Sequence, residues 1–427
     1  MDITQKLIII GEEVKLEKYS IGIGDRFGKE CAPQLEAVQL ARQNGVELVP
    51  VWNKSNREHS IIGSNPSNTQ QIIQSAVSEF KWKNSFYIDA DHINLKSVDH
   101  FLDYSNFFTL DVGEFINKRA SDEEITSFLK NISSFKGKVE IPGSKKMYDV
   151  DDSLLTMIAE KYLAAIKEAG KIYRHILSKK PDNNFVIEVS FDEVDEAQSP
   201  IDIFFILAAV AQEKIPIQTI APKFVGKFLK GIDYIGNLSE FEQEFEEIIL
   251  IIEQSKKIFD LPQNLKLSVH SGSDKFSIYP IINKIIKKHN TGIHVKTAGT
   301  TWLEELIGLA LSGTRGLSLV KEIYTEGYQR YDELLQPYLH SVEIQKDKLP
   351  TPNEVKSWSQ EKLIEALRHE PNSKTLDVNL RQLLHISFRI AAEKGKIYYD
   401  AMEEARTSIN KCVTENLFER HIKQLFF

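Results

Sequence analysis

The chain has 427 residues, of which 42% are hydrophobic and 27% charged, so it can bury a large core and is neither disordered nor fibrous. Lysine and arginine number 53 against 61 aspartates and glutamates, and the net charge of -8 offers no basic surface to nucleic acid or an anionic membrane. The two cysteines, Cys31 and Cys412, exclude a disulfide framework and a cysteine-based zinc site, and they fit a reducing cytoplasm. The apolar runs are too short for a signal peptide or for the roughly 20 residues of a membrane span.

Short β-type runs alternate with amphipathic helical stretches from about residue 19 to residue 312, which is the pattern of parallel βαβ units. Most of the predicted strands are continuously apolar, as expected for strands with both faces covered. They span residues 19–24, 46–51, 85–90, 107–111, 185–191, 217–224, 265–270 and 292–296. A candidate helix follows each strand, and the clearest are 32–44, 68–80, 200–213, 238–259, 277–289 and 302–311.

Eight such units predict a (β/α)8 TIM-type barrel, because a doubly wound sheet more often has five or six strands. The unit after the fourth strand contains an insertion at about residues 113–150. Within it we predict a short helix at 121–130 and a hairpin at 136–148, and we expect the insertion to cover or edge the site.

The strand signal ends near residue 317, and helical periodicity replaces it. The sequence therefore predicts two regions: a barrel over residues 1–316 and a helical C-terminal extension over 317–427 that packs on the barrel. Helices are expected within the extension at 319–335, 361–368, 378–393 and 396–422.

Histidines occur at the ends of three predicted strands. Active sites of (β/α)8 barrels lie at the C-terminal ends of the strands, where His92, His270 and His294 fall in the third, seventh and eighth units. Three neutral imidazoles with an open position form a site for one divalent cation, and zinc, nickel, cobalt, iron and manganese are all compatible with it. The alternative is that each histidine is a satisfied structural residue, with His294 pointing into the barrel wall.

Two carboxylates, Asp91 and Glu188, lie at strand ends on different sides of the predicted mouth. They are candidates for a catalytic base and acid, since a half-buried glutamate would have a raised pKa suited to donating a proton. The alternative for both is a salt bridge to a lysine at a neighbouring strand end. Asp192 and Glu193, beyond the fifth strand, are expected to be solvated loop acids.

Cations at the strand ends predict a substrate with an anionic group, either a carboxylate or a phosphate. The Ser-Gly-Ser turn at 271–273 adds hydroxyls that suit a polyhydroxylated molecule. Each lysine could instead be a buried ion-pair partner. The substrate-binding candidates are Asp25, Arg26, Lys223, Asp274, Lys275 and Lys296.

A glycine pattern at residues 22–28 follows a strand, but its third glycine is one residue too far along for a dinucleotide fingerprint. The sequence also has no P-loop, no Gly-x-Ser-x-Gly elbow and no His-Glu-x-x-His motif. ATP hydrolysis, serine hydrolysis and zincin proteolysis are therefore not supported.

Several motifs occur together in a fixed order. They are Gly24-Asp25-Arg26, Asp89-Ala90-Asp91-His92, the runs at 188–193 and 231–234, the octapeptide at 270–277, and the runs at 294–300 and 379–385. In these motifs the chain resembles the tagaturonate/fructuronate epimerase family, over roughly residues 20–390.

The resemblance implies a metal-dependent epimerase of hexuronate catabolism that interconverts D-tagaturonate and D-fructuronate, two keto sugar acids, by inverting C4. It implies that His92 and His270 are metal ligands with His294 as the third, that Asp91 is the proton acceptor, and that Glu188 is the proton donor.

Two departures from the family pattern concern the substrate. Only about twenty residues precede the Gly-Asp-Arg motif, and residues 112–115 replace an Asp-His pair that follows Asp111 in the family pattern. Another keto sugar acid, an uncharged ketose or a phosphorylated ketose therefore stays open as the substrate. The rival functions are a divalent-metal aldolase or isomerase acting on a sugar phosphate and a non-catalytic sugar-acid sensor.

C4 of a 2-ketose is β to the carbonyl, so its hydrogen is not acidic and enolisation alone does not invert it. Retro-aldol cleavage followed by aldol addition is the favoured route, and transient oxidation at C4 by a nicotinamide cofactor is the alternative. Arg381 and His385 share one helical face, which packs against the barrel, closes the site or forms an interface in a homo-oligomer; we expect packing.

Overall fold

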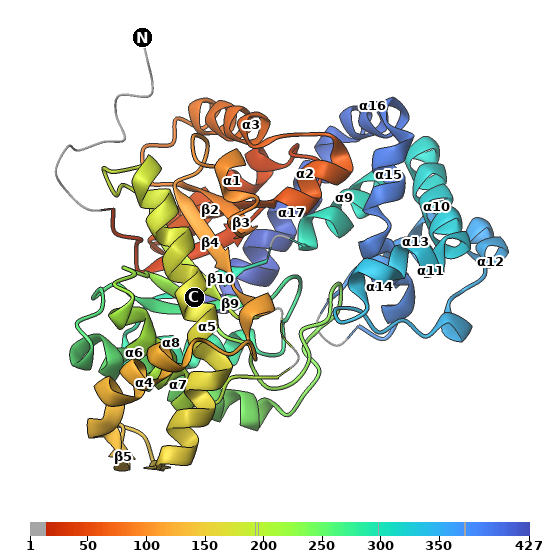
Figure 1. Cartoon of the computed structure of the whole chain (residues 1–427). Helices are drawn as coiled ribbons and strands as arrows, with labels where there is room; N and C mark the ends of the chain where they lie inside the picture. Colours follow the sequence, from red (N-terminus) through yellow and green to blue (C-terminus); the bar gives the residue numbers. More distant parts are fainter. Residues whose placement is uncertain (1–13, 193, 195, 298, 371–372) are drawn as a thin grey trace.

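The structure is a computed structural model that describes residues 14–192, 194, 196–297, 299–370 and 373–427. Parallel strands form a closed barrel in the order β1-β10-β9-β8-β7-β4-β3-β2 (Figure 1). This arrangement confirms the predicted (β/α)8 TIM-type fold. The strands are β1 (Tyr19–Ile23), β2 (Leu48–Ser55), β3 (Tyr87–Ile93), β4 (Phe107–Asp111), β7 (Val186–Ser190), β8 (Thr219–Ala221), β9 (Lys266–His270) and β10 (Ile293–Lys296).

Helices surround the barrel, and their starts follow local capping chemistry. At the start of α6, for example, Ser199 and Asp202 form a capping box around Pro200. The connection between β3 and β4 contains only a 3-10 turn, Val98–His100, so the prediction of a helix after every strand is wrong there. The helices between strands are α1 (Cys31–Gln43), α2 (Asn56–Ile62), α3 (Pro66–Glu79), α5 (Asp152–Lys179), α6 (Pro200–Gln212), α7 (Leu238–Ile258) and α8 (Tyr279–His289).

The insertion after β4 contains α4 (Asp122–Ile132) and the antiparallel hairpin of β5 (Gly137–Glu140) and β6 (Met147–Val150). It packs on the outside of the helix ring. The Phe135 ring stacks edge-on against Phe204 of α6, and the Tyr148 hydroxyl donates to Glu247 of α7 at 2.9 Å. The expectation that this helix and hairpin cover or edge the site is therefore wrong.

The helices that follow β10 lie beside the barrel (Figure 1) and form a second apolar cluster, which also takes in Phe27 from the barrel. None of the helices formed by the described residues is long and apolar enough to cross a membrane. These helices are α9 (Thr300–Leu311), α10 (Thr314–Gln329), α11 (Tyr331–Leu335), α12 (Pro352–Ser357), α13 (Gln360–Leu367), α14 (Val378–Ile386), α15 (Phe388–Lys394), α16 (Lys396–Glu404) and α17 (Arg406–Glu415).

The last part of the chain returns to the barrel. A π-helical segment, Asn416–Ile422, and α18 (Lys423–Phe426) bury Ile422 and Leu425 in the barrel's own apolar cluster. The carbonyl of Leu425 accepts a hydrogen bond of 2.8 Å from Asn283 on α8. The C-terminal segment thus covers part of the barrel that the helix after β10 leaves open.

Candidate active site and metal centre

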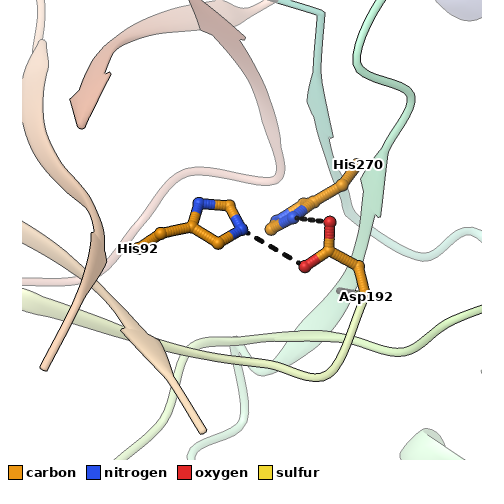
Figure 2. Close-up of side chains that lie close together, drawn as sticks. All are labelled: His92, Asp192 and His270. Atoms are coloured by element: carbon orange, nitrogen blue, oxygen red, sulfur yellow. Dashed lines mark hydrogen bonds and ion pairs between the residues drawn. The ribbon is translucent and has the colours of Figure 1, made fainter. Parts of the chain in front are cut away.

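Three side chains at the carboxyl ends of barrel strands point toward one another (Figure 2): His92 near the end of β3, Asp192 just after β7 and His270 at the end of β9. Nε2 of His92 lies 3.3 Å from Oδ1 of Asp192, and Nδ1 of His270 lies 3.0 Å from its Oδ2. One ligand atom from each residue lies within 4.8 Å of the other two. Imidazole nitrogen and carboxylate oxygen are ligands of divalent transition metals, so this triad is the candidate metal site among the described residues.

The surroundings of the two histidines fit a bound cation. The nitrogen of each ring that faces away from Asp192 has a carboxylate partner: Nδ1 of His92 is 2.9 Å from Asp91, and Nε2 of His270 is 2.8 Å from Glu188. Metal-binding histidines usually have such a partner on their second nitrogen. Nδ1 of His270, in spite of its short distance to Asp192, forms no hydrogen bond to any described residue. Burial would lower the pKa of His270, but Asp192 and Glu188 outweigh it and raise the pKa to about 9, so these carboxylates favour positive charge between them.

The position of His92 results from a local irregularity in the backbone of β3. The pairing register between β3 and β4 shifts between Ala90 and Ile93, and His92 has a φ of 51°, in the left-handed region that few non-glycine residues adopt. Such strain persists where the surroundings hold the residue, and it is common at functional sites. Asp192 is held in turn by the Ser190 hydroxyl, which donates to its Oδ1.

Lys296, on β10, lies among the acidic residues of the mouth. Its Nζ is 3.0 Å from Oδ1 of Asp91 and 2.9 Å from Oε1 of Glu188, and it donates to Oδ2 of Asp89 at 2.8 Å. Thr109 accepts from the same Nζ at 2.6 Å. The salt-bridge alternative for Asp91 and Glu188 thus holds with Lys296 as the partner.

These contacts fix the charge of the mouth. Burial would raise the pKa of Glu188, but Lys296 and His270 outweigh it and hold the pKa well below its usual range. The expected half-buried glutamate with a raised pKa is therefore wrong. The three carboxylates likewise outweigh burial and raise the pKa of Lys296 well above its usual value, so it is a cation and not a free amine. Oε2 of Glu188 is buried and has no hydrogen-bond partner among the described residues, so it can still accept a hydrogen bond from a substrate.

His294 lies in the barrel wall and is not part of the triad. Its Nδ1 is 2.9 Å from the Ser20 hydroxyl, and its ring packs against Phe107. Burial lowers the pKa of His294 to about 3, so the ring is neutral. The structure therefore corrects the third-ligand prediction in favour of Asp192, which is not a solvated loop acid. Glu193 lies outside the described residues.

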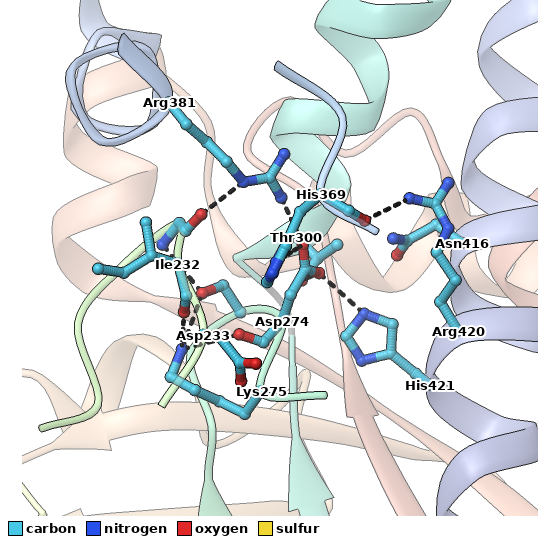
Figure 3. Close-up of polar contacts among 12 residues, drawn as sticks. Ile232, Asp233, Asp274, Lys275, Thr300, His369, Arg381, Asn416, Arg420 and His421 are labelled. Atoms are coloured by element: carbon cyan, nitrogen blue, oxygen red, sulfur yellow. Dashed lines mark hydrogen bonds and ion pairs between the residues drawn. The ribbon is translucent and has the colours of Figure 1, made fainter. Parts of the chain in front are cut away.

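Asp274 and Lys275 are fully buried structural residues (Figure 3), although the sequence predicted substrate contacts for them. Asp274 pairs with Arg381 and accepts from Thr300 at 3.0 Å. It also contacts His369 at 3.2 Å and His421 at 3.0 Å. Lys275 donates to the backbone carbonyls of Leu229 and Ile232, among others. The network joins the loop after β9 to the C-terminal helices, as the packing interpretation of Arg381 expects.

The other predicted substrate-binding residues have different surroundings. Asp25 accepts from the backbone N–H groups of Lys29 and Glu30, in the turn that leads into α1. Lys223 follows β8 and is half-buried, and its ammonium has no ion pair within the described ranges. Arg26 follows β1 at the mouth and pairs with Glu58. Of the six predicted substrate-binding residues, Lys296 and Arg26 are thus the charged groups that lie at the mouth and have defined ion-pair partners.

The fold and the site define a (β/α)8-barrel enzyme with a candidate metal centre at the carboxyl ends of its strands. A sequence model of the tagaturonate epimerase family matches residues 3–425. The chain belongs to this family, and it is therefore an enzyme of the isomerase class.

Individual relatives agree with this assignment. A tagaturonate/fructuronate epimerase of Thermotoga maritima is 27% identical over 423 residues, which cover 95% of this chain and 79% of that protein. The glycerol-bound crystal structure of the fructuronate-tagaturonate epimerase UxaE from Cohnella laeviribosi superposes with a TM-score of 0.79 at 22% identity, covering 97% of this chain and 82% of that one. The native structure of the same protein gives a TM-score of 0.77. The structural likeness supports the fold.

Proposed function

We propose that the protein interconverts D-tagaturonate and D-fructuronate by inverting C4, with the help of a divalent cation held by His92, Asp192 and His270. Family membership supports the hexuronate substrate. The observation that carries the chemistry is the arrangement at the mouth, where Asp91 and Glu188 each contact one triad histidine and both contact Lys296.

The donor set of two imidazoles and one carboxylate suits zinc, nickel, cobalt, iron or manganese. When bound, such a cation supplies a Lewis acid that polarises the ketone of the substrate.

The chain's own residues supply the proton transfers. In the proposed route Asp91, which is ionised, takes the proton from the C4 hydroxyl. The C4–O bond becomes a carbonyl, the C3–C4 bond breaks, and its electron pair forms an enediolate over C2 and C3. The released three-carbon aldehyde turns, C3 adds to its other face, and Glu188 returns a proton to the new C4 oxygen.

Lys296 completes the proton balance in this route. Glu188 starts ionised and needs a proton before it can give one, whereas Asp91 ends with a proton to lose. The ammonium of Lys296 contacts both carboxylates, at 2.9 and 3.0 Å, so it can pass one proton to Glu188 and accept the one held by Asp91. Its positive charge also stabilises the anionic enediolate nearby.

The function is tested by removing metal with a chelator, restoring single divalent cations and following each uronate. At least one metal should restore interconversion in the wild type and in His289→Ala, a control whose histidine pairs with Glu246 on the outer helices. His270→Ala should bind less metal, measured by elemental analysis, and should be inactive. A protein that binds one metal through these residues and leaves both acids unchanged would instead act on another ketose.

The bond-cleavage route has its own test. A carbonyl trap such as semicarbazide, added during turnover, should capture a three-carbon aldehyde that carries the carboxylate. Transfer of a labelled hydride from a nicotinamide cofactor to C4 would contradict the route and favour transient oxidation.

A further inference from the structure

Outside the metal triad, Nε2 of His385 and Nε of Arg26 are buried nitrogen atoms beside the barrel mouth that have no hydrogen-bond partner among the described residues. His385 is on α14 of the helical extension and is 1% exposed, and the Arg26 side chain is 14% exposed. Buried polar atoms in folded proteins nearly always have partners, because leaving one unpaired is costly. A ligand that accepts hydrogen bonds would satisfy either atom.

Glycines in the loops after the strands bring His385 close to the mouth. A Cβ added to Gly299, three residues after β10, would lie 3.0 Å from Nε2 of His385 and would clash with the carbonyl of Gly272. A Cβ added to Gly231, in the loop after β8, would lie 3.5 Å from Cβ of His385. The imidazole therefore packs against the loops that follow β8 and β10, and the second of these loops begins just after Lys296.

Arg26 reaches the same part of the helical extension. Its guanidinium lies 4.8 Å from the ring centre of Phe388, three residues after His385. Nη1 of Arg26 pairs with Glu58, while Nε keeps an unused N–H. The extension thus presents His385 and Phe388 to the side of the mouth that carries Arg26.

The local charge favours an anion here. Burial lowers the pKa of His385 well below its usual value, and the neighbouring cations, Arg26 foremost and then Lys230, lower it further. The imidazole is therefore neutral and can donate one N–H, and the charged groups that act on it most strongly are cations. A buried anion would gain from both properties.

We propose that Arg26 and His385 bind the carboxylate of the sugar acid. This inference rests on the proposed function and adds the group that selects a uronate over a neutral ketose. The triad residues lie at the carboxyl ends of β3, β7 and β9, whereas Arg26 follows β1, beyond β10 in the barrel. In fructuronate and tagaturonate the ketone is at C2 and the carboxylate at C6, so the two ends of one molecule suit two sides of the mouth.

The same contact would serve the bond-cleavage route. The three-carbon aldehyde carries the carboxylate, so Arg26 and His385 would hold this fragment while its carbonyl turns to present the other face. The helical extension would then take part in retaining the intermediate as well as in selecting the substrate.

The proposal is tested by calorimetric titration of metal-free protein with D-tagaturonate and by the kinetics of the metal-loaded enzyme. His385→Leu should weaken binding and raise KM at least tenfold, because a hydrogen bond to a charged group is lost. His385→Gln, which keeps an N–H donor, should recover part of the affinity, and Arg26→Lys should weaken binding as well. His289→Leu is the matched control, and thermal melting checks that each variant is folded.

Each result separates the subsite from the proposed function. If the wild type binds and converts the uronates and folded His385→Leu and His385→Gln bind them equally well, the subsite is wrong while the function stands. If the wild type binds neither uronate but binds D-tagatose 6-phosphate, and His385→Leu weakens that binding, the carboxylate assignment is overturned together with the substrate. Faster escape of the trapped aldehyde from His385→Leu would support the retaining role.

Discussion

Replacing Lys296 with methionine should show how strongly the acidic mouth depends on one ammonium. Nζ of Lys296 lies 2.8, 3.0 and 2.9 Å from oxygens of Asp89, Asp91 and Glu188, and the lysine side chain is 7% exposed. Removing one partner of a buried ion pair costs about 3–5 kcal/mol, because the remaining charge is left in a medium of low polarity. Three carboxylates share this partner, so we expect the free energy of unfolding at pH 7 to fall by at least about 3 kcal/mol.

The pH dependence of this loss follows from the same contacts. Lys296 helps to hold the pKa values of Asp91 and Glu188 below their usual range, so its contribution is present above the unfolded pKa values near 4 and is lost as pH falls through the folded ones. In Lys296→Met the carboxylates bind protons more readily in the folded state. The stability difference from the wild type should therefore shrink between pH 7 and pH 4.

Urea unfolding at a series of pH values measures both effects. Lys284→Met is the matched control, since Lys284 forms an ion pair of 2.6 Å with Glu242 but is 68% exposed. An exposed pair contributes at most about 1 kcal/mol. The reasoning would be refuted if Lys296→Met cost no more than Lys284→Met, or if its cost did not change with pH.

Three further predictions concern other parts of the molecule. Asp192→Asn should weaken metal binding at least tenfold in a competition titration with a chelator, because a charged ligand is lost; unchanged affinity would remove Asp192 from the site. Arg381→Met leaves Asp274 buried without its guanidinium, so urea unfolding should show a loss of about 3–5 kcal/mol, and a loss below about 1 kcal/mol would contradict this. Burial, and then Asp25, raise the pKa of Glu30 to about 8, so its protonated form stabilises the fold fully below the unfolded pKa near 4.5 and less as pH rises toward 8. Glu30→Gln should flatten the pH dependence of the urea midpoint between pH 5 and 8, and an unchanged slope would argue against Glu30 as its source.

The barrel could be predicted from the sequence because a strand covered on both faces has a simple signature. Continuous apolar runs separated by amphipathic segments permit few arrangements other than parallel βαβ units. The predicted strand ends then identified Asp91, His92, His270 and Lys296 as candidates, because active sites in this fold lie at the carboxyl ends of the strands.

The position of a side chain along the barrel axis was harder to predict than the face of the strand from which it points. His294 and Lys296 are two residues apart on β10, so both side chains point to the same face of the strand. Two residues along a strand correspond to about 6.6 Å, which is enough to put the lysine among the acids of the mouth and the histidine beside Ser20 in the wall. Local sequence pattern does not fix the end of a strand to within two residues, and it therefore could not separate these positions.

Asp192 and Asp274 show a different limit, since distant parts of the chain decide their roles. Asp192 follows its strand directly, as a site residue should, but only the fold shows that two histidines from other strands face it. Asp274 looked like a site residue for the same reason. Its partners Arg381 and His421 lie more than a hundred residues further along, in the C-terminal helices, where no local pattern connects them to the loop after β9.

That loop links the candidate metal centre to the helical extension. It starts directly after His270, the last residue of β9, and four residues beyond His270 Asp274 is held by Arg381 and His421. Between them, the backbone N–H and the hydroxyl of Ser271 bond to the carbonyl of Lys296, at 2.9 and 2.7 Å. The position of His270 is therefore fixed by β10 and, through Asp274, by the C-terminal helices. The extension also supplies His385 to the mouth, so we infer that the C-terminal helices help to set the geometry of the site, and that the barrel strands alone do not define it.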